Sequence, residues 1–367
     1  MSSSNPEPAV SQPSLPHRTI LRSWLSPASG RNTPLAVTLV LLDYALFLAA
    51  VTGTVWVRNL SVKLLLGVAA GFLIGRLFIL GHDACHQSFT VHRRLNRWLG
   101  RLVFLPSLTP YSLWEAGHNV VHHGYTNLKG ADFVWRPLTL EEFRALPRWR
   151  RALERVYRSG WAPWLYYLIE MWWLRMYFPS RARMSARRAV FFWDGVLVSA
   201  AALAWIGALV AAAGASGQSA WVTVGAGFVV PFLFWNGMIG FVVYLHHTHA
   251  GVAWYDEKAE WSRSQPFVTT TVHITFRPRL LGLDAGALLH HIMEHTAHHV
   301  DMGIPLYRLK QAQKILETRL PGSIVRQPFS WRWYFDTARR CKLYDFKAHR
   351  WTGFSGIPTS APVVLAA

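Results

Sequence analysis

The chain has 367 residues, of which 51% are hydrophobic and only 16% are charged. Soluble domains usually carry about a quarter charged residues, so this composition excludes a disordered chain or a coiled coil and indicates a membrane protein. Lys and Arg number 38 against 19 Asp and Glu, and two cysteines are too few for a disulfide framework.

Residues 1–34 are rich in Ser and Pro and lack the apolar core of a signal peptide, so we expect a flexible cytoplasmic tail. Four later segments are long and apolar enough to cross about 30 Å of hydrocarbon. These predicted transmembrane helices are residues 35–57, 64–80, 189–213 and 220–245. Residues 161–178 combine many aromatic side chains with Glu170 and Arg175, which predicts a helix lying along the membrane interface. Residues 352–367 are expected to form a C-terminal tail, and no second domain is evident.

The basic residues are unevenly distributed around the predicted helices. Residues 81–188 hold seventeen of the Lys and Arg, and residues 246–367 hold fifteen. The positive-inside rule therefore places both termini and both basic segments in the cytoplasm. The excess of positive charge is interpreted as a signal of topology, strengthened by contact with anionic lipid, and nucleic acid is excluded as a partner.

Thirteen of the seventeen histidines form four clusters beside the predicted helices. The clusters are His82 and His86; His118, His122 and His123; His246, His247 and His249; and His290, His291, His295, His298 and His299. Residues three or four apart share one face of a helix, so the first pair and the trio 295, 298 and 299 can each face a single point. His118 and His122 also fit this spacing. His123 points away in a regular helix, so it either reaches a second metal or requires a deformed helix.

These clusters favour a metal centre, because neutral imidazole is a common ligand of iron, copper and zinc. Eight or more histidines exceed one tetrahedral zinc site and predict two metals. The neighbouring carboxylates Asp83, Asp132 and Glu294 are expected to orient the ligands through their second ring nitrogens. A donor set made only of histidine favours two iron ions that activate O2. A metal-ion transporter or a di-haem cytochrome would place histidines inside the membrane-spanning segments, which here contain none.

Three motifs resemble the histidine boxes of the membrane fatty acid desaturase superfamily: HDACH at 82–86, HNVVHH at 118–123 and HTAHH at 295–299. The closing CKLYDFKAHRW at 341–351 looks like the C-terminal end of bacterial omega-6 (delta-12-type) desaturases. The resemblance covers residues 35–351. It implies an all-α membrane protein with four transmembrane helices and a cytoplasmic helical cap that holds a histidine-rich di-iron site.

The resemblance also implies which side chains bind the two iron ions. They are the box residues His82, His86, His118, His122, His123, His295, His298 and His299, with His290 as a further ligand and His249 as the second choice. His246, His247 and His291 remain unassigned. Side chains near the second box are expected to line or support the substrate site, namely Trp114, Asn119, Tyr125 and Asn127.

The activity implied by the resemblance is O2-dependent desaturation of a fatty acyl chain carried by lipid, CoA or acyl carrier protein, giving a cis double bond of delta-12 or omega-6 type. The sequence has no His-Pro-Gly-Gly haem motif, so electrons are expected from a separate carrier such as ferredoxin. The expected location is the bacterial inner membrane, with the active site in the cytoplasm. A hydroxylase, an acetylenase or a carotenoid ketolase would share the ligands, and a metal-ion transporter is the alternative of a different class.

Overall fold

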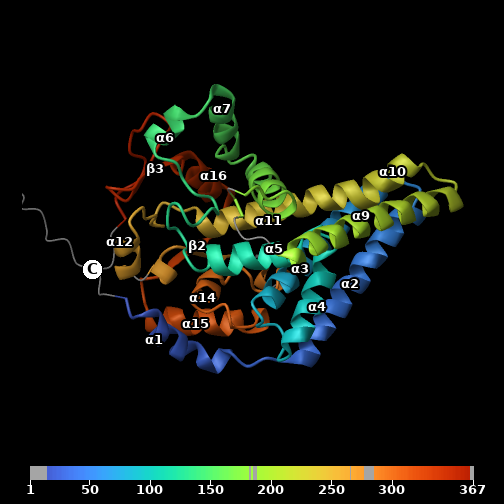
Figure 1. The fold of residues 1–367 in the computed structure, drawn as a ribbon, viewed down its shortest axis with the longest axis horizontal. Coiled ribbons are helices and arrows are strands. Elements are labelled where there is room, and N and C mark those ends of the chain that lie inside the picture. The colour runs from blue at the N-terminus through green and yellow to red at the C-terminus, as the bar shows by residue number, and fades with distance from the viewer. Residues whose placement is uncertain (1–14, 182, 185–187, 265, 277–284, 364–367) are drawn as a thin grey trace, which may run out of the picture.

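The computed structural model describes residues 15–181, 183–184, 188–264, 266–276 and 285–363. Within these residues the chain is mainly helical, as predicted, with two small sheets that a purely helical prediction lacks. The long helices extend together to one side, and most of the short helices and the strands gather at the other (Figure 1).

Four long apolar helices confirm the predicted pattern of membrane-spanning segments by length and composition. They are α2 (Thr33–Trp56), α3 (Leu60–Cys85), α9 (Ala189–Ala215), and a fourth that runs through α10 (Ala220–Val224), a π-helical segment (Gly225–Val229) and α11 (Val230–His247). Helices α3 and α11 continue beyond the apolar segments seen in the sequence. Histidines of two clusters therefore belong to the last turns of long helices.

The remaining elements are short. The helices are α1 (Arg18–Leu25), α4 (Arg93–Phe104), α5 (Tyr111–Glu115), α6 (Leu140–Ala145), α7 (Arg148–Tyr157), α8 (Pro163–Tyr166), α12 (Lys258–Arg263), α13 (Ala285–Leu288), α14 (His295–Val300), α15 (Leu309–Arg319) and α16 (Trp331–Arg340). π-Helical segments cover Ala116–His122 and Tyr167–Tyr177, and 3-10 turns cover Ser26–Ala28, Pro266–Val268 and Leu306–Arg308. Strands β1 (Val272–Thr275) and β2 (Val325–Pro328) pair in parallel, and β3 (Leu343–Asp345) and β4 (Arg350–Thr352) pair antiparallel.

The N-terminal segment, expected to be a flexible tail, contains helix α1 in its described part. Leu21 and Leu25 are buried, and Arg18 donates to the backbone carbonyls of His299 (2.8 Å) and Val300 (3.0 Å). Residues 1–14 of the expected tail lie outside the described residues. Helix α1 thus contacts the segment that carries the third histidine motif.

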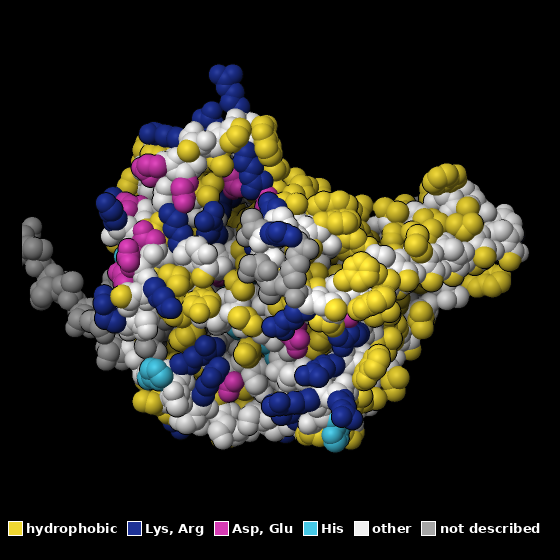
Figure 2. Space-filling model, viewed as in Figure 1, with side chains coloured by type: hydrophobic (Ala, Val, Ile, Leu, Met, Phe, Trp, Pro, Cys, Tyr) yellow, Lys and Arg dark blue, Asp and Glu magenta, His cyan; other side chains and the backbone are white. Residues whose placement is uncertain are grey.

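The surface is mainly apolar over the long helices and rich in Lys and Arg over the part that contains most of the short helices and the strands (Figure 2). Hydrophobic side chains cover the long helices in Figure 2, whereas most of the visible Lys and Arg lie over the other part. On the long helices Leu41, Leu65, Leu203 and Trp221 are each more than 60% exposed. Large apolar side chains exposed in such numbers need an apolar environment, which the interior of a membrane supplies.

Helix α3 approaches α11 and the π-helical segment before it very closely at glycines spaced four residues apart. A Cβ atom added to Gly67 would lie 2.4 Å from the carbonyl oxygen of Ala226, and one added to Gly71 would lie 2.7 Å from that of Pro231. Small residues allow this backbone proximity between apolar helices, where dispersion contacts stabilise the packing. The close approach also fixes the distance between the histidine-bearing ends of α3 and α11.

We predict that Gly71→Ala lowers the free energy of unfolding by about 1–3 kcal/mol, because the added methyl group meets backbone and forces α3 away from α11. Gly195→Ala in α9 is a matched control, since no atom lies within 4 Å of its added Cβ. Thermal unfolding of both variants in detergent provides the comparison. Equal melting temperatures for the two variants would contradict the packing argument.

Candidate metal centre

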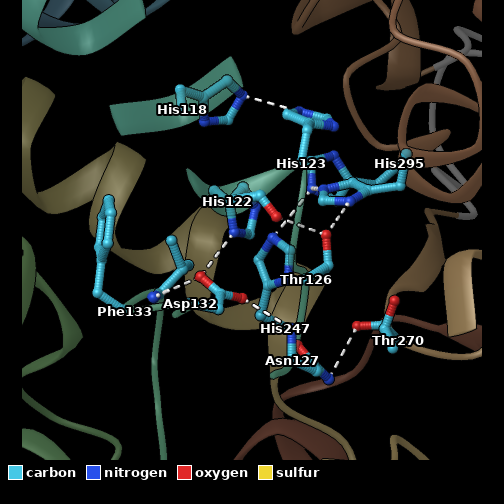
Figure 3. A network of polar contacts seen from close by, with 12 residues as sticks. His118, His122, His123, Thr126, Asn127, Asp132, Phe133, His247, Thr270 and His295 are labelled. Carbon is cyan, nitrogen blue, oxygen red and sulfur yellow. Dashed lines mark hydrogen bonds and ion pairs between the residues drawn. The ribbon is translucent and has the colours of Figure 1, made fainter. Parts of the chain in front are cut away.

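Histidines from four separate segments meet in two adjacent groups. The first histidine group consists of His82, His86, His118, His123 and His298, and the second of His122, His247 and His299. Within each group, one ring nitrogen per residue lies within 4.8 Å of all the others. The rings of His123 and His299 stack with centroids 4.2 Å apart, so the groups share a boundary. Part of this arrangement is drawn in Figure 3.

A π-helical turn determines how the second motif divides between the groups. Residues Ala116–His122 are π-helical, and the backbone N–H of His123 donates to the carbonyl of His118, five residues earlier. This wider turn brings residues i and i+5 onto one face. The Nε2 atoms of His118 and His123 are therefore 3.0 Å apart, and His122 points to the second group. The sequence left open a deformed helix or a second metal for His123, and the structure contains the deformed helix.

The spacing of the ring nitrogens fits metal ligation. The Nε2 atom of His118 lies 3.0 Å from that of His82, and the Nε2 atoms of His298 and His123 are 3.1 Å apart. Two nitrogens bound at right angles to one ion, each at roughly 2.1 Å, would be about 3.0 Å apart. Both ring nitrogens of His86 are buried without a hydrogen-bond partner among the described residues. A buried imidazole without partners is costly, and an ion supplies the missing interaction.

Burial keeps these imidazoles neutral at physiological pH. Desolvation and the neighbouring histidines lower the pKa of His118 and His123 well below the usual value. Burial, together with the nearby His122, lowers the pKa of His298 to about 3. A neutral imidazole keeps a nitrogen lone pair for a metal, so the protein does not have to release a proton from these rings before binding.

Hydrogen bonds orient two rings of the second group. His122 Nδ1 donates to Asp132 Oδ1 at 3.0 Å, and the backbone N–H of Asn127 donates to the other oxygen of Asp132 at 2.9 Å (Figure 3). Thr126 Oγ1 donates to the carbonyl of His122 and accepts from His299 Nδ1 at 3.1 Å. In both rings the proton is held on Nδ1, which leaves the Nε2 lone pair for an ion.

A cavity of about 660 Å³ reaches the histidines. Its lining includes His82, His118, His122, His247 and His295, and most of the other lining side chains are apolar. The apolar residues include Phe78, Ile79, Leu113, Trp114, Val121, Met171, Ile239 and Val242. This volume is in the range of ligand-binding pockets. The site therefore joins histidines with the spacing of metal ligands to a largely apolar cavity.

The model of the family described as fatty acid desaturase matches residues 59–331. The chain belongs to the fatty acid desaturase family. Its relatives include "Omega-6 fatty acid desaturase, chloroplastic" of Glycine max, 27% identical over 280 residues, which are 76% of this chain and 62% of that protein. A second is "sn-1 oleoyl-lipid 12-desaturase" of Arthrospira platensis, 28% identical over 66% of this chain and 65% of the relative. "Omega-3 fatty acid desaturase fat-1" of Caenorhabditis elegans is 31% identical over 74% of this chain and 65% of its own length. The chain thus covers less than two thirds of each of these three relatives.

The third histidine motif, residues 295–299, contributes side chains to both groups. His298 lies in the first group and His299 in the second, whereas the spacing predicted one common point for both. The Nε2 atom of His295 is 3.1 Å from those of His247 and His299, at the edge of the second group. The two imidazoles of the first motif, His82 and His86, stay together as predicted.

His247 belongs to the second group although the sequence left it unassigned. Its position in the last turn of α11 is the signal that could have identified it, because the histidine-bearing end of α11 lies beside the histidine-bearing end of α3. Its neighbour His246 stacks on His295 with ring centroids 3.9 Å apart and places Nε2 3.0 Å from the sulfur of Met293.

Three other histidines have partners outside both groups. His290, expected to be a further ligand, places Nε2 2.7 Å from Asp43 Oδ2. His249, the second choice, accepts from the backbone N–H of Gly251 and lies 3.4 Å from Gln327. His291 pairs with Glu294 at 3.3 Å.

The expected supporting residues differ in their contacts. Asp132 orients His122, whereas Asp83 accepts from Ser88 Oγ and from the backbone N–H of Leu306. Glu294 contacts His291, as stated above. Among the described residues neither Asp83 nor Glu294 forms a hydrogen bond with a histidine of the two groups, and both carboxylates hold the polypeptide around the site.

Of the four residues expected to line or support the cavity, two line it and two form hydrogen bonds with backbone carbonyls. Trp114 stacks on His118 at 4.0 Å, and both Trp114 and Tyr125 line the cavity. Asn119 donates to the carbonyl of Cys85, and Asn127 donates to that of Ala253. The two asparagines therefore tie backbone segments together behind the site.

Asp43 is buried within α2. Its side chain connects α2 and α3 to the segment that directly precedes α14. Its Oδ1 accepts from Arg76 Nη2 at 2.9 Å, its Oδ2 contacts His290, and Arg76 also donates to the carbonyl of Leu288. His290 and His291 both have positive φ angles, a backbone conformation that is unfavourable for residues other than glycine. The ionic network therefore holds a strained turn just before α14.

We predict that Asp43→Asn destabilises the protein by about 3 kcal/mol, because Arg76 loses its buried carboxylate partner. The measurement is the free energy of unfolding in detergent. The control is Asp336→Asn, whose partners Arg339 and Arg340 are exposed, and which should cost less than about 1 kcal/mol. A similar small loss for both variants would contradict the structural role given to Asp43.

Proposed function

We propose that the chain is an O2-dependent fatty acyl desaturase that introduces a cis double bond of delta-12 or omega-6 type at a di-iron centre. The observation that carries the proposal is the pair of convergent histidine groups, members of which line a largely apolar cavity. The names of the relatives from Glycine max and Arthrospira platensis support the reaction and the position of the double bond.

The proposed ligands are the eight histidines of the three boxes together with His247 in place of His290 or His249. When bound, the two iron ions would supply the reduction of O2 that drives oxidation of the acyl chain. One O2, two electrons, two protons and the two hydrogens of a methylene pair give one double bond and two waters. The electrons come from a separate carrier, for which we propose a ferredoxin-like protein.

The contribution of the protein is to position and enclose the substrate. The apolar wall holds a flexible acyl chain with one pair of methylene carbons beside the histidines, which removes much of the entropic cost of the reaction. The same wall excludes water from the site. Asp132 and Thr126 keep the protons of His122 and His299 on Nδ1, so that both rings remain oriented ligands.

The proposed location is a membrane, with four spanning helices and with both termini and the histidine groups in the cytoplasm. The charge distribution supports this orientation, because the long basic segments follow α3 and α11. We assign residues 35–351 to the desaturase domain and the flanking residues to its tails. The bacterial inner membrane is the proposed compartment.

We predict that His298→Ala and His122→Ala, one from each group, lower the iron bound per chain and abolish turnover, because each removes a ligand from a different ion. Iron is measured in the purified protein by mass spectrometry of the element. His249→Ala is the control, since His249 lies outside both groups, and should retain the iron of the wild type. Full iron content in either test variant would refute its place in the ligand set.

We expect expression in a bacterium that makes only saturated and monounsaturated lipids, together with a ferredoxin and its reductase, to yield dienoic acyl chains. Mass spectrometry locates the new double bond, and the His298→Ala variant provides the background. A hydroxylated or acetylenic product would indicate a different enzyme on the same scaffold. Unchanged lipids in cells that contain iron-loaded protein and the reductase would contradict the proposed activity.

A further inference from the structure

A second, smaller pocket lies at the surface between α1 and α12. Its volume is about 280 Å³, and the side chains that line it include Arg18, Arg22, Trp261 and Phe267. Arg22 is exposed, so the pocket opens to the surface. In Figure 1 both helices lie on the left, among the short helices and away from the long ones. The pocket shares no lining residue with the large cavity that reaches the histidines.

The arginines of this pocket contact the backbone of the third histidine motif. Arg18 Nη2 donates to the carbonyl of His299 at 2.8 Å, and its Nε donates to the carbonyl of Val300 at 3.0 Å. Arg22 Nε donates to the same carbonyl of Val300 at 3.2 Å. The backbone of a proposed metal ligand is therefore one hydrogen bond away from a side chain that lines a surface pocket.

A second connection reaches the imidazole of His299 itself. Trp261 lines the pocket and is 8% exposed, and its indole N–H donates to the carbonyl oxygen of Thr126 at 2.8 Å. The hydroxyl oxygen of Thr126 lies 3.1 Å from His299 Nδ1. Within Thr126 the path is covalent. Because bonds and hydrogen bonds couple redox centres more strongly than gaps do, these contacts form a continuous path from the surface to the second histidine group.

The proposed reaction needs such a path on a face other than that of the large cavity. An acyl chain that fills the large cavity excludes other molecules from it, and His299 is only 1% exposed. Electrons therefore have to enter through the protein. Trp114, which stacks on His118, contacts Phe78 of α3 and Phe104 of α4, so the contacts there lead toward the long apolar helices. The contacts of Trp261 lead to a polar surface.

The charge of the pocket indicates the kind of partner that fits it. Arg18 and Arg22 line it, and no carboxylate does so within the described residues. Asp301 lies outside the lining, 3.8 Å from Arg22 Nε. Arg263, two residues after Trp261, is exposed on α12. A positively charged rim around an aromatic side chain fits a partner with an acidic face.

We propose that a small one-electron carrier with an acidic face docks over the pocket between α1 and α12, and that its electrons reach the metal centre through Trp261, Thr126 and His299. The inference rests on the proposed function and adds where the redox partner of that function binds. Each encounter oxidises the carrier by one electron and reduces the bound iron by one. Two encounters supply the two electrons that one double bond consumes, and no bond to hydrogen is made or broken on the path.

The docking step is tested by binding. An oxidised, acidic plant-type [2Fe–2S] ferredoxin is titrated calorimetrically into the iron-loaded protein in detergent at low and at high salt. Arg22→Gln should weaken binding by about fivefold at low salt and by less at high salt, because salt screens the attraction that the variant loses. Arg148→Gln in α7 is the matched control, since Arg148 is exposed and lies outside the pocket. Hydrogen exchange of the complex should show protection of α1 and α12.

The electron path is tested by the rate at which pre-reduced ferredoxin reduces the ferric protein, followed without O2 in a stopped-flow instrument. At saturating ferredoxin this rate should fall severalfold in Trp261→Phe, because phenylalanine has no N–H to donate to Thr126. The affinity for ferredoxin should stay that of the wild type. Trp149→Phe, at a tryptophan of α7 that is 69% exposed, is the control. Reduced methyl viologen, a small cation, should reduce Arg22→Gln as fast as the wild type.

The outcomes separate the docking surface from the activity. Wild-type affinity in Arg22→Gln and a wild-type reduction rate in Trp261→Phe, or protection confined to other helices, would overturn the inference even if the protein forms double bonds. Failure of the wild type to bind the acidic ferredoxin at low salt would also overturn it. Since Arg22 is exposed, its variant tests docking even if Trp261→Phe fails to fold. Docking and iron reduction at this surface without any double bond would instead refute the proposed function.

Discussion

Imidazoles that are buried, neutral and turned toward one another constrain the rest of this structure. Burying so many polar rings is unfavourable unless each nitrogen has a partner, and both nitrogens of His86 have none in the described part of the chain. The histidines come from the ends of two long helices, a π-helical turn and α14. Their convergence therefore depends on accurate packing of segments that lie far apart in the sequence.

Two sets of contacts hold these segments in place. Gly67 and Gly71 allow α3 to contact the backbone of the fourth long helix, so the histidine-bearing ends of α3 and α11 have little freedom to separate. Asp43 joins Arg76 to His290 and fixes the turn that precedes α14. The glycine contact acts by close apolar packing, and the Asp43 network acts by charge. Both hold the proposed ligands in position without contacting them. Residues distant from the chemistry thereby determine its geometry.

The sequence was sufficient to predict what depends on local pattern. Apolar length located the four long helices, and histidine spacing located the motifs that meet at the site. It could not predict how His298 and His299 divide between groups, because this depends on where other helices end. The role of His290 was equally hidden, since its partner Asp43 is 247 residues away. Asp43 lies alone as a charged residue in an apolar segment, and nothing in its sequence neighbourhood indicates a histidine partner.

The π-helical turn at Ala116–His122 has a consequence for how such motifs vary. A turn with one extra residue places i and i+5 where a regular helix places i and i+4. An inserted residue is thus absorbed as a local bulge, and the outer imidazoles of the motif keep their relative positions. Motif length and ligand geometry can therefore change independently, so a search that demands one fixed spacing would overlook chains that hold the same arrangement of donors.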